Sequence, residues 1–204
     1  IGAKRLADYG LNVRFMPLAL AGIEHIKNHP EDRAADLLAA FRNPEIDMIL
    51  CAIGGDDTYR LAPYLFANGE LETAVSGTDK IFLGFSDTTV NHMMLHKVGV
   101  KTFYGQSFLS DVCELGGEML PYTRRYFEEL IRTGTIRAVT PSSTWYESRK
   151  DFSPKQIGVP LTAHPDTGFE LLQGRPRFSG KILGGCIDTL FDFFDGGRYA
   201  DMPV

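Results

Sequence analysis

The chain contains two apolar runs that each stop at a glycine turn and are each followed by a helical pattern. The first run covers residues 46–53 and stops at Gly54 and Gly55, and the second covers residues 81–83 and stops at Gly84. Each unit is typical of a buried strand, a tight turn and a helix. Because strands joined through helices lie parallel, the alternation predicts an α/β fold with a doubly wound, mostly parallel sheet and flanking helices.

Other segments of the first 135 residues fit this arrangement. Apolar residues at helical spacing, with glycines or prolines at the segment ends, predict five helices. They cover residues 1–10, 32–41, 58–66 and 121–133, and the stretch that follows residue 86 and ends at residue 98. Further strands are predicted at 12–16 and 101–105. We therefore expect residues 1–135 to form an amino-terminal α/β domain that carries the functional site.

The character of the sequence changes after residue 135. Residues 141–165 are rich in Pro, Ser and Asp and contain Trp145, which predicts a long loop or extended arm. Short alternating pieces flank this stretch, and residues 181–194 predict a further strand and helix. We expect residues 136–204 to form a connecting arm and the start of a second, mixed α/β or β-rich domain. The first residue is Ile1 and both ends look cut, so a truncated domain is expected.

Composition narrows the class of protein. The chain has 204 residues, of which 44% are hydrophobic and 23% charged, as in folded globular proteins. A net charge of −5 and the lack of a Lys/Arg run argue against nucleic-acid binding. No apolar run reaches the roughly 18 residues of a membrane span, so we expect a soluble, cytoplasmic protein without membrane partners. Cys51, Cys113 and Cys186 are widely spaced and indicate core thiols, with neither a disulfide framework nor a zinc site.

Ser86 stands where the second apolar run meets the following helical pattern. A serine there projects at the carboxyl edge of the sheet, where the N–H groups of a helix start favour negative charge. It is a candidate nucleophile or anion-binding hydroxyl. The alternative is an ordinary helix N-cap, because Ser and Asp are preferred at that position. The turn also lacks the second glycine of the Gly-x-Ser-x-Gly elbow.

The two glycine turns are expected at the same edge of the sheet. Ligands of doubly wound sheets bind at the carboxyl ends of the strands. One turn can present a nucleophile, and the other can bring backbone N–H groups close to a developing oxyanion.

Four blocks of the sequence, in order, resemble the family of serine peptidases that comprises LD-carboxypeptidase and the microcin C self-immunity protein. The blocks are residues 53–60, 84–89, 103–106 and 184–186. The resemblance implies that Ser86 is the nucleophile and that backbone N–H groups of Gly55 and Asp87 form the oxyanion hole. It also implies that Gly54 and Trp145 contact the substrate. In the self-immunity branch, aromatic residues of the arm stack on a nucleobase, and Trp145 is the best match to them.

The resemblance implies a serine carboxypeptidase or amidase-type hydrolase that cleaves murein LD-peptides or peptidyl or aminoacyl adenylates. Members of the family complete a Ser-His-Glu triad from a carboxyl-terminal domain, so the His and Glu are expected beyond the given chain, and this chain alone is expected to be inactive. A homodimer without cofactors is also implied.

His92 and His96 lie four residues apart, which is a metal-ligand spacing, but the HExxH motif is absent. We interpret them as packing or surface residues, with no metal site. The alternative to an enzyme is a non-catalytic α/β module that binds a small ligand at the same edge.

Overall fold

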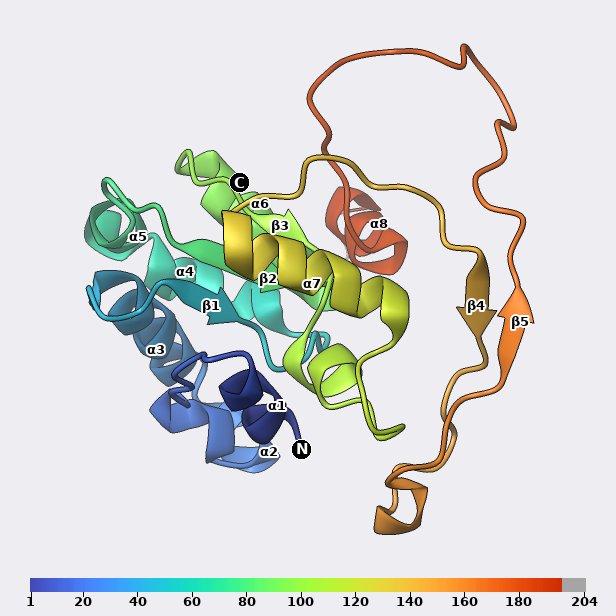
Figure 1. The fold of residues 1–204 in the computed structure, drawn as a ribbon. Coiled ribbons are helices and arrows are strands. Elements are labelled where there is room, and N and C mark those ends of the chain that lie inside the picture. Colours follow the sequence, from blue (N-terminus) through green and yellow to red (C-terminus); the bar gives the residue numbers. More distant parts are fainter. Residues whose placement is uncertain (196–204) are drawn as a thin grey trace.

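A three-stranded parallel sheet forms the centre of the computed structural model, which describes residues 1–195 (Figure 1). Its strands are β1 (Met48–Leu50), β2 (Ile81–Gly84) and β3 (Phe103–Tyr104), in that order across the sheet. Ile49 lies opposite Phe82, and Leu83 lies opposite Phe103. The predicted α/β fold with a parallel sheet is confirmed. Residues 196–204, the end of the predicted second segment, lie outside the described residues.

Helices connect the strands and cover the sheet. They are α1 (Gly2–Asp8), α2 (Ile23–Asn28), α3 (Pro30–Arg42), α4 (Ala62–Leu65), α5 (Glu70–Ala74), α6 (Thr89–Lys97), α7 (Pro121–Thr133) and α8 (Ile187–Asp195). Short 3-10 turns, η2 (Thr58–Leu61) and η4 (Ser86–Thr88), precede α4 and α6. Within residues 1–195, no helix is both long and apolar enough to cross a membrane.

The strands place alternate side chains into two apolar clusters, one on each face of the sheet. Phe82 packs with α3, α4, α5 and α6, whereas Leu83 packs with α1 and α7 on the other face. Successive side chains of a strand point to opposite faces, so a run buried on both sides is apolar throughout. Figure 1 shows α7 lying across the sheet.

Several predicted strands are shorter than expected or absent. The strand predicted at 46–53 is regular only over Met48–Leu50, although Cys51 N–H still donates to the Leu83 carbonyl at 2.9 Å. The prediction of a strand at 12–16 was wrong. This stretch packs Val13 against the cluster around Leu83, but it pairs with no strand in the described part of the chain. Alternating burial is therefore possible for an extended segment that lacks a strand partner.

The second region, residues 136–195, contains a two-stranded antiparallel ribbon, a small second sheet. Strands β4 (Thr144–Tyr146) and β5 (Ala163–Pro165) pair with Trp145 opposite His164. The predicted arm thus contains a ribbon, and Figure 1 shows it standing away from the central sheet. The strand expected before residue 187 is absent, whereas the helix after it is present as α8.

Candidate functional site

Ser86 occupies a strained turn at the carboxyl end of β2. Its backbone φ is +64°, in the left-handed region, directly after the extended residue Phe85. Such a conformation costs a non-glycine residue about 1–3 kcal/mol and persists where the surroundings enforce it. A serine on a sharp strand-to-helix turn is the arrangement of a nucleophile elbow. The predicted strand, turn and helix are confirmed here.

The alternative reading of Ser86 as a helix N-cap is wrong. The residue before η4 is Phe85 and the residue before α6 is Thr88, and neither segment has a side-chain cap hydrogen bond. The Ser86 hydroxyl is therefore not committed to capping a helix.

The Gly54 turn packs directly against Ser86. A Cβ atom built on Gly54 would lie 2.7 Å from Ser86 Cβ, 2.9 Å from Ser86 Oγ and 3.0 Å from the Asp87 nitrogen. Gly55 has a φ of +115°, which side chains rarely adopt. The structure therefore brings four of the predicted site residues, Gly54, Gly55, Ser86 and Asp87, to one edge of the sheet.

The side chain of Asp87 joins the two turns. It is 2% exposed, and its Oδ2 accepts a hydrogen bond from the Thr58 N–H at 2.8 Å. Thr88 Oγ1 donates to the Phe85 carbonyl at 2.8 Å, and Thr89 Oγ1 donates to the Ser86 carbonyl at 2.7 Å. These bonds fix the backbone around Ser86 on both sides.

Ionisable groups close to the turns are paired or protonated. Asp57 Oδ1 binds Arg33 Nη1 at 2.8 Å, beside the Gly54 turn. Burial raises the pKa of the Cys51 thiol to about 12, so this cysteine stays protonated and packs beneath Gly84. The prediction that Cys51 is a core thiol agrees with this environment.

The histidines that follow Ser86 differ in their surroundings. His92 is buried under the turn, and His96 is exposed on the same helix, as expected for packing and surface residues. No group of three or more His, Cys, Asp or Glu side chains within residues 1–195 could hold a metal ion.

Trp145 lies on the ribbon and apart from the four residues at the sheet edge. It is 48% exposed, and its indole stacks on the His164 ring with centroids 4.3 Å apart. His164 Nε2 lies 2.8 Å from Glu147 Oε1. The ribbon that carries Trp145 and His164 stands away from the sheet (Figure 1).

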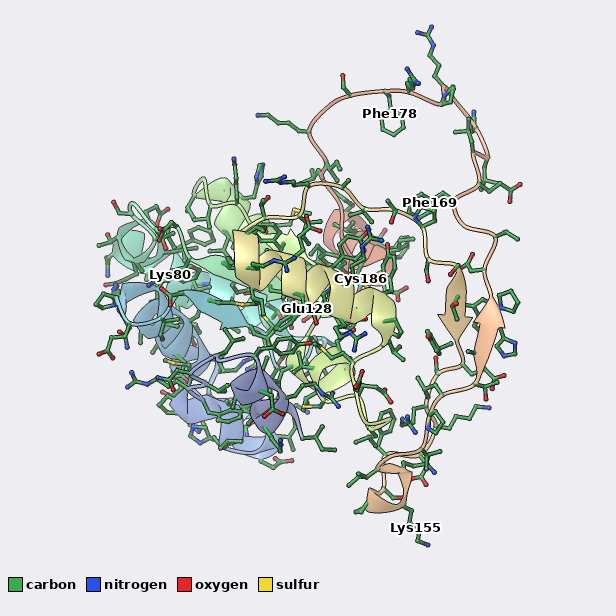
Figure 2. The ribbon with its side chains drawn as sticks, viewed as in Figure 1. Lys80, Glu128, Lys155, Phe169, Phe178 and Cys186 are labelled. Carbon is green, nitrogen blue, oxygen red and sulfur yellow. The ribbon has the colours of Figure 1, made fainter. Side chains whose placement is uncertain are left out.

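The second region contacts the sheet edge again at Cys186, which immediately precedes α8 and is labelled in Figure 2. The Cys186 N–H donates to Thr89 Oγ1 at 2.9 Å. A Cβ atom on Gly185 would lie 2.4 Å from Thr89 Cγ2, so only glycine permits this approach. Thr89 thus links the Ser86 carbonyl to the second region.

Sequence reasoning missed Thr89 and Tyr104 as neighbours of Ser86. The Ser86 N–H donates to the Tyr104 hydroxyl at 2.9 Å. Tyr104 ends β3 beside β2, and residues at the carboxyl ends of adjacent parallel strands converge on one edge. Its position could therefore have indicated a site residue.

Comparisons with known proteins identify the family to which the chain belongs. The family model of peptidase S66, the LD-carboxypeptidase N-terminal domain, matches residues 1–105. A solved structure of an MccF-like protein from Streptococcus pneumoniae in complex with AMP is 61% identical, with a TM-score of 0.95, covering 98% of this chain and 58% of that one.

Two curated relatives match at lower identity. The microcin C7 self-immunity protein MccF of Escherichia coli is 26% identical over 78% of this chain and 45% of its own length. The Bacillus subtilis protein named "Probable murein peptide carboxypeptidase" is 29% identical over 91% of this chain and 48% of its own length. The chain spans about half the length of these curated relatives. With residues 1–105 matching the family model, the chain belongs to the peptidase S66 family of LD-carboxypeptidases.

Proposed function

We propose that Ser86 is the nucleophile of a serine carboxypeptidase or amidase-type hydrolase. The observation that carries the proposal is the left-handed backbone of Ser86 at the end of β2, with Gly54 packed against its side chain. Strain of this kind is retained in folded proteins where function requires it. The membership in the peptidase S66 family supports a peptidase activity.

The neighbouring turns supply groups that stabilise the oxyanion and border the substrate in acyl transfer. Ser86 Oγ attacks the substrate carbonyl carbon, and an ester forms as the amide C–N bond breaks and the amine leaves with the proton that the hydroxyl gives up. Water then hydrolyses the ester, which releases the acid and restores the serine. Backbone N–H groups of Gly55 and Asp87 donate to the developing oxyanion. Gly54 borders the substrate through its backbone, because the lack of a side chain lets its turn lie directly against Ser86.

A serine hydroxyl needs a base to be an effective nucleophile. Among residues 1–195, no histidine hydrogen-bonds Ser86 Oγ. His96 is exposed, and the other four have other partners: His25, His29 and His164 bind carboxylates, and His92 binds Thr102 and Gly84. We propose that the His and Glu of a Ser-His-Glu triad lie outside the given chain. Loss of a triad member lowers the rate by several powers of ten, so the 204-residue chain alone should be inactive.

The substrate is an amide of a peptide or of a peptidyl or aminoacyl nucleotide. AMP in the structure of the 61% identical relative supports the nucleotide conjugates. The exposed indole of Trp145 would then stack on the base. Murein LD-peptides are the second substrate class, supported by the name of the Bacillus subtilis relative.

The proposal is tested by hydrolysis assays on the full-length protein that carries this chain. An aminoacyl sulfamoyl adenosine and an LD-tetrapeptide are incubated separately with wild type and with Ser86→Ala, and the products are measured by mass spectrometry. We expect cleavage of at least one compound by wild type and none by the variant. Nucleotide binding without cleavage by wild type would support the non-catalytic binding module instead.

A further inference from the structure

The backbone N–H of Ser86 is held by Tyr104, whose own ring rests on a buried histidine. Tyr104 Oη accepts from Ser86 N–H at 2.9 Å. The Tyr104 ring lies 5.4 Å from the His92 ring, centroid to centroid, with 55° between the planes. Tyr104 itself is partly open to solvent, and the His92 ring lies against it.

His92 also binds the backbone at the end of the strand that delivers Ser86. Its Nε2 lies 3.1 Å from the Gly84 carbonyl oxygen, and its Nδ1 lies 2.7 Å from Thr102 Oγ1. The Phe82 ring contacts the imidazole edge to face at 5.2 Å. His92 therefore joins α6 to β2 and to the start of β3, directly beneath the turn.

The two hydrogen bonds specify the protonation of the ring. A carbonyl oxygen only accepts, so Nε2 carries the proton and donates to Gly84. Nδ1 then accepts from the Thr102 hydroxyl. Burial lowers the pKa of His92 and keeps this neutral form. Because both nitrogens are occupied, the ring has no free atom with which to take a proton from Ser86.

We propose that His92 is a positioning residue that, through Gly84 and Tyr104, holds Ser86 in its left-handed conformation and so sets its reactivity. The inference rests on the proposed role of Ser86 as nucleophile. It differs from a packing role, because a packing residue would affect stability without changing the reactivity of a folded enzyme. The peptidase S66 match ends at residue 105 and thus includes both His92 and Tyr104.

The test measures how fast a fluorophosphonate labels Ser86 in the full-length protein that carries this chain. His92→Leu removes both hydrogen bonds, and His92→Gln keeps an N–H that can donate to the Gly84 carbonyl. Tyr104→Phe removes only the hydroxyl that accepts from Ser86 N–H, at a residue open enough that the fold should persist. His96→Leu is the matched control, because His96 lies exposed on the same helix.

We expect the second-order labelling rate constant to fall about tenfold or more in His92→Leu and about fivefold in Tyr104→Phe, in line with the loss of buried hydrogen bonds. His92→Gln should recover to within about threefold of wild type because it keeps one of the two bonds. His96→Leu should react like wild type. In hydrolysis assays, the His92 effect should fall on kcat and leave KM unchanged.

The experiment distinguishes failure of the proposed function from failure of the positioning role of His92. If wild type is not labelled at Ser86, the proposed function fails. If wild type is labelled and folded Tyr104→Phe and His92→Leu react equally fast, the function stands and the positioning role is overturned. Should His92→Leu not fold, Tyr104→Phe alone decides, because an unchanged rate would overturn the proposal and a reduced rate would support it.

Discussion

Residues 1–135 and residues 136–195 bury their apolar side chains to very different extents. Phe82 and Phe127 in the first region are 1% and 0% exposed, whereas Phe178 and Ile182 in the second are 90% and 99% exposed. Figure 2 shows Phe169 and Phe178 on the arm, away from the central sheet. The first region can hold a strained serine because its neighbours are close-packed and transmit strain. The second region has no comparable packing within the described residues.

Besides the packing of Ile136 against the cluster around Leu83, polar contacts join the second region to the first. Arg149 Nη2 binds Glu114 Oε1 at 2.5 Å, and these side chains are only 6% and 10% exposed. The Gly158 N–H donates to the Leu115 carbonyl at 2.7 Å. The surroundings of Ser86 are thus fixed by close packing, whereas the Arg149–Glu114 pair and the Gly158–Leu115 bond tie residues 149 and 158 to the first region.

The largest effect is expected from Gly54→Val. The new side chain would meet Ser86 Cβ and Oγ inside normal contact distance, so the turn must shift. Because displaced catalytic groups lose orientation, we expect hydrolysis to fall about 100-fold or more. Steady-state kinetics on the full-length protein measure this. Gly180→Ala, where a Cβ meets nothing within 4 Å, is the control and should keep wild-type activity. Equal activity of the two variants would contradict the assignment of Gly54 to the site.

Glu114→Gln tests the ion pair between Glu114 and Arg149 that joins the arm to the first region. Breaking a buried ion pair leaves the Arg149 charge without its partner, which costs about 3 kcal/mol. We expect faster proteolysis within residues 141–165 and unchanged amide exchange in β2. The matched control is Glu147→Gln, whose pair with His164 is exposed and worth little. Destabilisation of β2 to the same extent as the arm would contradict the separation of the two regions.

Trp145→Ala tests the function of the arm. Stacking on a base is worth about 1–3 kcal/mol, so we expect AMP to bind about tenfold more weakly. Fluorescence titration of wild type should show quenching of the indole by AMP, since Trp145 is the single Trp of the chain. In the full-length protein, subtraction of the Trp145→Phe signal isolates this residue. Phe152→Ala, another exposed aromatic of the arm, should bind AMP like wild type. Unchanged affinity in Trp145→Ala would exclude base stacking there.

The smallest effect is a pH dependence of stability from His92. Its pKa in the folded protein is lowered below 6.5 by burial, so the unfolded chain binds the proton more readily. Stability from this group is present above pH 6.5 and is lost as the pH falls towards the folded pKa. The free energy of unfolding of wild type, minus that of His92→Gln, should therefore fall as the pH drops below about 6.5. Urea unfolding at several pH values measures it, and a difference that grows at low pH would contradict the assignment.

The sequence predicted the elements that are defined by local patterns. The strand, turn and helix around Ser86 follow from an apolar run, a glycine and helical spacing, all within 18 residues of each other. The meeting of Gly54 with Ser86 follows from the parallel topology, because both turns lie at the carboxyl ends of neighbouring strands. These predictions rest on rules that need no knowledge of side-chain packing.

Contacts between distant segments could not be predicted in this way. The bond from Cys186 to Thr89 joins residues 97 positions apart, and nothing in either local pattern indicates it. Residues 12–16 alternate like a strand, but strand formation depends on a partner that local alternation does not reveal. The pairing of β4 with β5 was missed because Pro and Ser in residues 141–165 favour a loop, whereas the pairing of Trp145 with His164 is a tertiary effect.

Peptide mapping of the fluorophosphonate adduct on the full-length protein tests directly whether Ser86 is the nucleophile. We expect a single adduct on Ser86, lost in Ser86→Ala and strongly reduced in Gly54→Val. An adduct on another serine, or no adduct on a folded protein that still binds AMP, would contradict the assignment of Ser86 as the nucleophile.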